Sequence, residues 1–332
     1  MRLSDFDFHL PESLIAQAPL ADRDGARMLV LDRKAGTWQD CVFRDFPSFL
    51  FPGDCLVLND SRVLPSRLLG HRPGTTGKIE VFLTKPLTSD FSQWEALVKP
   101  GRKMGVGETV VISEELSVEV MGRGEHGERT VRLISSVPAM AALEKAGHVP
   151  LPPYIRRPDS AADRERYQTV FASTPGSVAA PTAGLHFTPE VLQRCEAAGA
   201  EIARVTLHVG LGTFQPIRED NLEDVKLHTE SFEVSRAATE AMDRARRVVA
   251  AGTTSVRSIE SDPGSNQTNI FIKPGFAFRR TGAMLTNFHL PQSSLLVLVS
   301  AFAGKELVLD AYHHAVREGY RFFSYGDCMF IR

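Results

Sequence analysis

The sequence predicts an α/β protein in which a large, distorted barrel-like α/β domain carries an inserted small all-β barrel. The 332 residues exceed the roughly 150 that one domain usually takes. Short alternating apolar segments fill residues 67–135, whereas helical and strand-like patterns alternate after residue 158. We therefore expect residues 1–66 and 150–332 to form one discontinuous α/β domain, and residues 67–149 to form the inserted barrel domain.

Each element follows from a local pattern. Apolar runs bounded by Gly, Asp or Pro predict two buried N-terminal strands, Met28–Leu31 and Cys55–Leu58. In the middle of the chain, Gly-rich turns separate five expected strands: Ile79–Leu83, Trp94–Val98, Thr109–Ile112, Ser117–Met121 and Thr130–Leu133. Five or six short strands with no helix between them are typical of a small closed barrel.

The C-terminal part begins after a predicted short helix, Ala139–Ala146, and an irregular linker, Val149–Pro158, whose prolines fix φ and lack an N–H donor. Three helices are predicted beyond it: Pro189–Ala198, Ala237–Ala250 and Leu307–Glu318. Two strands are predicted between them: Glu201–His208 and Ser294–Ser300.

Composition restricts the function. A net charge of −2 supplies no overall attraction to nucleic acid, so an RNA partner would have to meet a local basic patch. The four cysteines include no Cys-x-x-Cys pair, so neither a zinc ribbon nor a disulfide framework is indicated. The longest apolar stretch, near Leu295–Ala303, is too short to span a bilayer. We expect a cytoplasmic protein that contacts no membrane.

Polar residues stand where several apolar runs end, which is the usual place for binding sites in α/β folds. The strand at Glu201–His208 runs into a Gly-x-Gly-Thr turn made by Gly210, Gly212 and Thr213. Gln215 replaces the third glycine of a dinucleotide fingerprint, so this segment alone favours a structural turn over a ligand loop.

Thr182 and His186 precede the helix that Thr188 caps. Neither has an evident structural explanation, although a single histidine is more often structural than catalytic.

Three further clusters combine polar and aromatic side chains. Thr253, Thr254 and Arg257 could together hold a carboxylate, although a capped turn with a surface arginine explains them equally well. The two aromatic clusters, Thr286–Pro291 and Phe323–Asp327, suit the stacking and hydrogen bonding of a purine-like base, although such aromatics are more often core. Basic residues that a fold could gather into a phosphate-binding stripe recur at Arg62, Arg67, Arg72, 99–103, Arg156, Arg157, Arg164, Arg166, Arg279 and Arg280.

Together and in this order, these motifs resemble the S-adenosylmethionine:tRNA ribosyltransferase-isomerase family of queuosine biosynthesis. The resemblance is carried by Leu-Val-Leu-Asn-Asp-Ser-Arg-Val at 56–63, Pro-Leu-Pro-Pro-Tyr-Ile at 150–155, Arg-Tyr-Gln-Thr-Val at 166–170, Ala-Pro-Thr-Ala-Gly-Leu-His-Phe at 180–187, Leu-His-Val-Gly-x-Gly-Thr-Phe at 207–214, Gly-Thr-Thr-Ser-Val-Arg at 252–257, Thr-Asn-Phe-His-Leu-Pro at 286–291 and Ser-Tyr-Gly-Asp at 324–327. The chain departs from the family at Val225, where a histidine often stands, and in the short segment 262–269.

The resemblance implies an unusual reaction. The ribosyl part of S-adenosylmethionine moves to 7-aminomethyl-7-deazaguanine at the tRNA wobble position and rearranges, giving epoxyqueuosine, while adenine and methionine leave. A base near the acidic C5′ hydrogens and a donor for the departing adenine are needed. The resemblance implies the catalytic residues His186, His208, His289 and Asp327. It implies the substrate-binding residues Asn59, Arg62, Tyr167, Thr182, Phe187, Gly210, Gly212, Thr213, Glu230, Thr253, Thr254, Arg257, Asn287 and Tyr325.

Within these sets, Phe187 or Tyr325 suits the sulfonium by cation–π contact, and Arg257 suits the methionine carboxylate. No metal or further cofactor is implied, because S-adenosylmethionine is a consumed substrate, and we expect a monomer.

Two other functions compete with this one. A methyltransferase that uses S-adenosylmethionine would commonly carry a Gly-x-Gly-x-Gly loop after its first strand, which this sequence lacks. A non-catalytic tRNA-binding protein would not need polar residues clustered at strand ends. If the chain is the enzyme that the resemblance implies, one pocket should be bordered by segments 182–187, 208–213, 252–257, 287–289 and 325–327.

Overall fold

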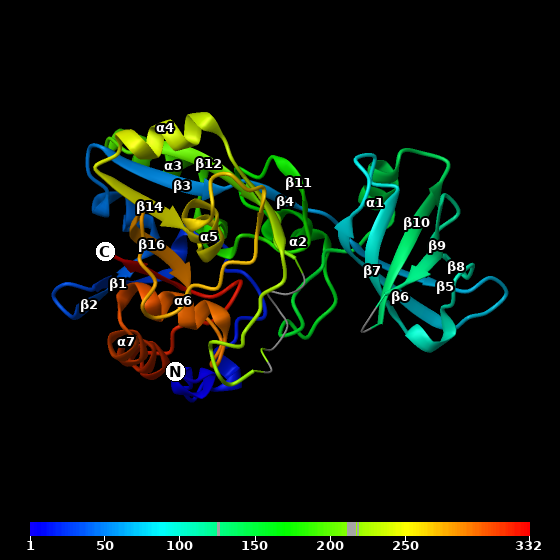
Figure 1. The fold of residues 1–332 in the computed structure, drawn as a ribbon, viewed down its shortest axis with the longest axis horizontal. Helices are drawn as coiled ribbons and strands as arrows, with labels where there is room; N and C mark the ends of the chain where they lie inside the picture. Colours follow the sequence, from blue (N-terminus) through cyan, green and yellow to red (C-terminus); the bar gives the residue numbers. More distant parts are fainter. Residues whose placement is uncertain (125–126, 211–216, 218) are drawn as a thin grey trace.

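The computed structural model describes residues 1–124, 127–210, 217 and 219–332, and it consists of two bodies (Figure 1). The larger one is built on a nine-stranded mixed sheet with helices on both faces, and the smaller one is a closed six-stranded barrel. The expected α/β class with an inserted all-β barrel is therefore confirmed. The exact limits of the two domains stay a prediction.

The large sheet has the strand order β15-β13-β12-β3-β14-β16-β17-β1-β2. The layout that we expected to be barrel-like is therefore a mixed sheet that ends at β15 and β2. Its strands are β1 (Arg27–Asp32), β2 (Thr37–Val42), β3 (Asp54–Asn59), β12 (Glu201–Leu207), β13 (Glu230–Val234), β14 (Arg247–Ala251), β15 (Gln267–Thr268), β16 (Thr281–Asn287) and β17 (Cys328–Ile331). A two-stranded sheet beside it pairs β4 (Ser61–Val63) with β11 (Thr174–Ser177).

Helices cover both faces of this sheet because the buried strands alternate their apolar side chains between the two sides. One face packs against helices α4 (Arg236–Arg244), α5 (Thr253–Glu260), α6 (Ser294–Ala303) and α7 (Lys305–Arg317). The other face packs against α3 (Pro189–Ala197) and the 3₁₀ helix η4 (Phe43–Phe49). Further 3₁₀ helices are η1 (Leu3–Phe6), η2 (Glu12–Leu14), η3 (Arg23–Gly25) and η7 (Thr182–His186).

Two sequence predictions in this body are wrong. The segment Ser294–Ser300, predicted as a strand, lies in α6, whose apolar side chains are buried on nearly every side and therefore show no helical period. The predicted helix Ala237–Ala250 is two elements, because α4 ends at Arg244 and the chain turns into strand β14.

The barrel contains β5 (Arg67–His71), β6 (Lys78–Pro86), β7 (Gln93–Lys99), β8 (Thr109–Val111), β9 (Leu116–Arg123) and β10 (Glu128–Ser135), closed in the order β10-β7-β6-β5-β8-β9. A single 3₁₀ turn, η5 (Gly101–Lys103), interrupts these strands within the described residues. The helix α1 (Ala139–Ala146) packs Leu143 onto the barrel core, which forms a hydrophobic cluster of its own.

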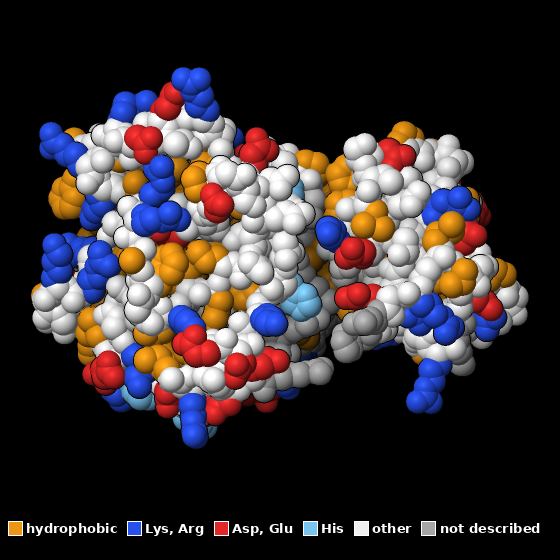
Figure 2. Space-filling model, viewed as in Figure 1, with side chains coloured by type: hydrophobic (Ala, Val, Ile, Leu, Met, Phe, Trp, Pro, Cys, Tyr) orange, Lys and Arg blue, Asp and Glu red, His pale blue; other side chains and the backbone are white. Residues whose placement is uncertain are grey.

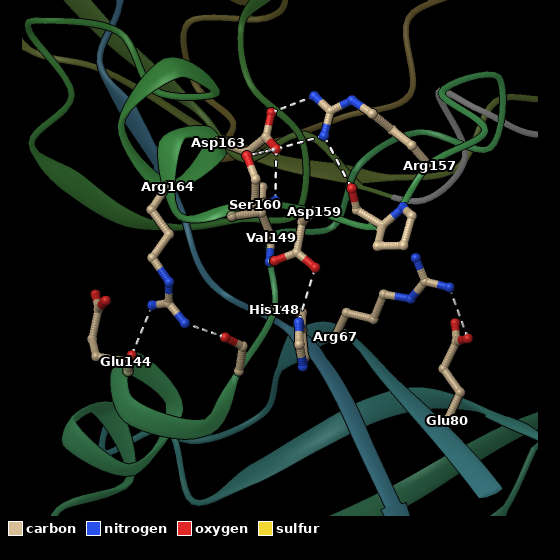
Figure 3. A network of polar contacts seen from close by, with 12 residues as sticks. Arg67, Glu80, Glu144, His148, Val149, Arg157, Asp159, Ser160, Asp163 and Arg164 are labelled. Atoms are coloured by element: carbon tan, nitrogen blue, oxygen red, sulfur yellow. Dashed lines mark hydrogen bonds and ion pairs between the residues drawn. The ribbon is translucent and has the colours of Figure 1, made fainter. Parts of the chain in front are cut away.

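Polar contacts connect the two bodies (Figure 3). Arg164, in α2 (Ala161–Arg166), donates to the carbonyls of Glu144 and Gly147 at the end of α1. His148 contacts Asp159 at 2.9 Å, and Asp159 also accepts the N–H of Val149. These contacts hold the segment by which the chain leaves the barrel close to α2.

Candidate functional site

The strand directions bring distant segments to one edge of the large sheet. Strands β12, β3, β14 and β16 run parallel to one another, so their carboxyl ends lie at the same edge. β17 is antiparallel to β16, so the chain enters β17 at that same edge. The residues that follow Leu207, Ala251 and Asn287 therefore meet the residues that precede Cys328.

A cavity of about 520 Å³ lies at this edge, within the usual size range of small-molecule sites. Four of the five predicted segments line it through these residues: Thr182, Ala183, Val209, Gly252, Thr253, Thr254, Asn287, Phe288 and His289. The fifth segment does not, because Phe323 and Ser324 line the cavity in place of Tyr325 and Asp327. Gly212 and Thr213 lie outside the described residues.

The helix α5 begins at the cavity wall. Gly252 takes a positive φ of 96°, which suits glycine and turns the chain from β14 into the helix. Thr254 Oγ1 is buried with no hydrogen-bond partner among the described residues. A bound group can therefore form hydrogen bonds with the Thr254 hydroxyl and with the first N–H groups of α5. The positive end of the helix dipole favours an anion there.

Two of the predicted histidines contact adjacent residues at the end of β16, His289 at Thr286 and His186 at Asn287. His289 lines the cavity, and its Nε2 is 2.7 Å from Thr286 Oγ1, while its backbone N–H donates to the Tyr312 hydroxyl. His186 Nε2 lies 3.3 Å from Asn287 Oδ1. Burial lowers the pKa of His289 to about 3 and that of His186 to about 4, so both imidazoles are neutral at pH 7.

His208 follows β12 and is only partly buried. Its Nδ1 has no hydrogen-bond partner among the described residues, and its ring lies so close to Gly176 that a Cβ there would be 2.7 Å from the ring. Burial lowers the pKa of His208, and the nearby Asp60 carboxylate acts in the opposite direction. Its neighbour Val209 lines the cavity, whereas His208 itself does not.

Glu230 and Arg257 form a buried ion pair, with side chains 6% and 7% exposed. The second oxygen of Glu230 accepts the N–H of Gly210 at 2.9 Å, so the pair also holds the backbone that follows β12. Arg257 Nε and Nη2 are buried without partners among the described residues. Arg257 lines a small side cavity that shares Ser294 and Leu295 with the main one.

Two predicted site residues instead hold strands together. Asp327 accepts the N–H groups of Arg27 and Arg321 at 2.9 and 2.8 Å, which ties the start of β1 to the start of β17. Asn59 donates to the Leu207 carbonyl and accepts the N–H of Leu207 and of Ser61. Backbone groups contact the polar atoms of both side chains, and neither residue lines the cavity.

The predicted aromatic contacts also lie elsewhere. Phe187 is fully buried edge-on against Phe43, 5.0 Å between ring centroids, which leaves no face for a sulfonium. Tyr325 donates to Asp163 at 2.8 Å and packs against the buried Tyr167. Arg62 is half exposed and pairs with Glu144 of α1 at 2.9 Å.

The cavity has an aromatic wall, of which sequence reasoning expected Phe323 and missed Tyr154. Tyr154 stacks on Phe323 with 4.5 Å between ring centroids, and its hydroxyl is 2.6 Å from Ser324 Oγ. Both rings line the cavity. Tyr154 lies in Val149–Pro158, which was predicted only as an irregular linker. Its motif, Pro-Pro-Tyr, nevertheless belongs to the segments that carry the family resemblance.

The described residues contain neither a metal-ligand cluster nor a helix that could span a membrane. No group of three or more His, Cys, Asp or Glu side chains there is arranged to hold a metal ion. None of the described helices has the length and apolar character needed to cross a membrane.

Comparison with known proteins places the chain in a family. The family model described as "Queuosine biosynthesis protein" matches residues 3–331. Proteins named S-adenosylmethionine:tRNA ribosyltransferase-isomerase from Solibacter usitatus and Pelobacter propionicus are 59% and 47% identical, each covering 100% of both chains. A crystal structure of the S-adenosylmethionine tRNA ribosyltransferase from Thermotoga maritima is 35% identical, with a TM-score of 0.55, covering 99% of this chain and 100% of that one. The chain belongs to the queuosine biosynthesis family that these proteins represent.

Proposed function

We propose that this chain is an S-adenosylmethionine:tRNA ribosyltransferase-isomerase. It transfers and isomerises the ribosyl moiety of S-adenosylmethionine onto 7-aminomethyl-7-deazaguanine at the tRNA wobble position, and adenine and methionine are released. The observation that carries this proposal is the match of the whole chain to relatives named for this enzyme, 59% identical in one case. The cavity supports it, since about 520 Å³ is room for a nucleoside with a short tail.

The cavity offers separate surfaces for the parts of S-adenosylmethionine. The stacked rings of Tyr154 and Phe323 form an aromatic wall that suits the flat adenine base. The methionine tail would extend toward Ser294 and Leu295, where the side cavity begins. There its carboxylate could meet the N–H groups of Arg257 that have no partner among the described residues. The predicted role of Arg257 therefore remains available although one of its nitrogens is paired with Glu230.

The three histidines differ in what they can do. His186 and His289 stay neutral far below pH 7. His289 lines the cavity and can donate or accept a hydrogen bond toward the substrate or its leaving adenine, whereas His186 does not line the cavity and contacts Asn287, which does. His208 Nδ1 is buried without a hydrogen-bond partner in the part of the chain that the structure describes, and the nearby Asp60 carboxylate opposes the effect of burial on the pKa of His208. We propose His208 as the base for the C5′ proton, acting once the substrate brings that proton within reach.

One assay tests this function against both alternatives. The protein is incubated with S-adenosylmethionine and tRNA that carries 7-aminomethyl-7-deazaguanine, and the products are separated. Adenine plus methionine is the expected result. S-adenosylhomocysteine would show a methyltransferase, and no turnover would show a binding protein. We expect the enzyme to work as a cytoplasmic monomer without a metal or further cofactor.

A further inference from the structure

A second large cavity, of about 710 Å³, lies on the outer face of the barrel and has no part in the site described above. We call it the barrel groove. Its lining includes Leu69 and His71 of β5, Lys78 and Glu80 of β6, and Lys99 of β7, with Pro100 after it.

Strand pairing explains why these side chains meet. Residues alternate between the barrel core and its outside, so Val81 and Val98 point inward while Lys78, Glu80 and Lys99 point outward. Leu69 pairs with Glu80, and Glu80 pairs with Lys99, so these three form one row across adjacent strands. His71 and Lys78 form the next row. Rigid strands therefore hold the cations of the groove in place.

The barrel groove has an excess of positive charge. Its carboxylate, Glu80, is already paired with Arg67 at 2.9 Å, as Figure 3 shows. Lys78 and Lys99 have no carboxylate within ion-pair distance among the residues that the structure describes. Figure 2 shows both basic and acidic side chains on the visible faces of the large domain and of the barrel. Two uncompensated lysines on one rigid face therefore create a local site for anions in a protein whose net charge is −2.

The chemistry of the groove suits a sugar–phosphate chain better than an isolated anion. Beside the lysines lie the hydroxyls of Thr75 and Thr76 and an apolar strip that includes Leu69, which is 47% exposed. Ammonium groups bind phosphates, hydroxyls bind ribose, and apolar surface packs against the sugar. We propose that the barrel groove binds the backbone of the tRNA substrate outside the modified nucleotide, an inference that rests on the function proposed above.

The test replaces both lysines, Lys78→Ala and Lys99→Ala, in the full-length chain. The matched control is Lys85→Ala on the same strand, because Lys85 lies near a carboxylate of Glu95 and outside the groove. Turnover is measured with tRNA that carries 7-aminomethyl-7-deazaguanine. The double variant should raise KM for tRNA about tenfold, with kcat and the KM for S-adenosylmethionine unchanged. In binding measurements with labelled tRNA, its log Kd against log salt slope should fall by about 1.5.

Two results separate the possible failures. If wild-type protein releases adenine normally and the double variant matches Lys85→Ala in both KM and salt slope, the groove does not bind RNA and this inference is wrong. If wild-type protein releases no adenine, the proposed function fails first, and a loss of tRNA affinity in the double variant would still support the groove. Circular dichroism and thermal melting check that each variant keeps its fold.

Discussion

The barrel and the large domain bury very different kinds of residues. The barrel core is made of apolar side chains such as Leu68, Val81, Trp94 and Val118, and Arg129 is an exception whose guanidinium donates to backbone carbonyls. The large domain buries a long series of polar groups, and many of them stand at one edge of its sheet. Buried polar groups cost free energy unless they are paired, so their concentration at one edge indicates a candidate functional region, although some of them also hold strands together.

The largest expected effect comes from breaking the buried pair in the large domain. Arg257→Ala leaves Glu230 buried without its cation, which should lower the free energy of unfolding by about 3–5 kcal/mol. The matched control is Arg244→Ala, which removes a surface pair with Glu201 and should cost less than about 1 kcal/mol. Urea unfolding measures both. Equal losses for the two variants would contradict the claim that burial makes the first pair critical.

His208→Ala tests the catalytic side of the comparison. We expect kcat to fall at least about 100-fold, as is common for loss of a proton-transfer group, while the melting temperature changes little. His313→Ala on the exposed surface of α7 is the control and should leave turnover unchanged. A variant that melts earlier but keeps near-normal kcat in its folded fraction would show that His208 is structural.

Acid should destabilise the large domain before the barrel. Burial lowers the pKa of His186 to about 4 and of His289 to about 3, so the unfolded chain binds more protons than the folded one below pH 6.5. Their stabilising contribution is complete above that pH and declines as the pH falls toward the folded pKa values. Between pH 7 and pH 5, each histidine should cost on the order of 2 kcal/mol.

The two tryptophans allow this to be measured in each region. Trp94 is buried in the barrel and Trp38 lies in β2 of the large domain. A Trp38→Phe variant reports on the barrel, and a Trp94→Phe variant reports on the large domain. His289→Asn should weaken the pH dependence of unfolding seen by Trp38. An unchanged pH dependence in that variant would show that His289 does not titrate on unfolding.

The comparison also explains which parts of the fold are predictable from sequence. Barrel strands such as Thr130–Leu133 alternate apolar and polar residues because one side faces the core, so local pattern identifies them. In the large domain, α6 is buried among other elements and loses its helical period, and it was taken for a strand. Short strands such as β17, whose burial depends on distant partners, give no comparable local signal.

The site was predictable only to the level of segments. Polar residues after parallel strands must converge, which is why Thr253 and His289 were expected and found at one cavity. The sequence does not show which polar groups the fold itself satisfies. Asp327 and Asn59 look like functional residues in a motif, yet backbone N–H groups occupy their oxygens.

The smallest expected effect concerns the contact between the two regions. Arg62 and Glu144 form a half-exposed ion pair between the large domain and α1, so Arg62→Ala should lower the free energy of unfolding by less than about 1 kcal/mol. Its effect on substrate distinguishes two roles. If Arg62 contacts RNA, as its motif predicts, Arg62→Ala should raise KM for tRNA a few-fold. Glu144→Ala should then not raise it, because Arg62 is left free to bind phosphate. If both variants raise KM equally, Arg62 acts only by holding the barrel in place, and the motif would report on domain contact and not on RNA binding.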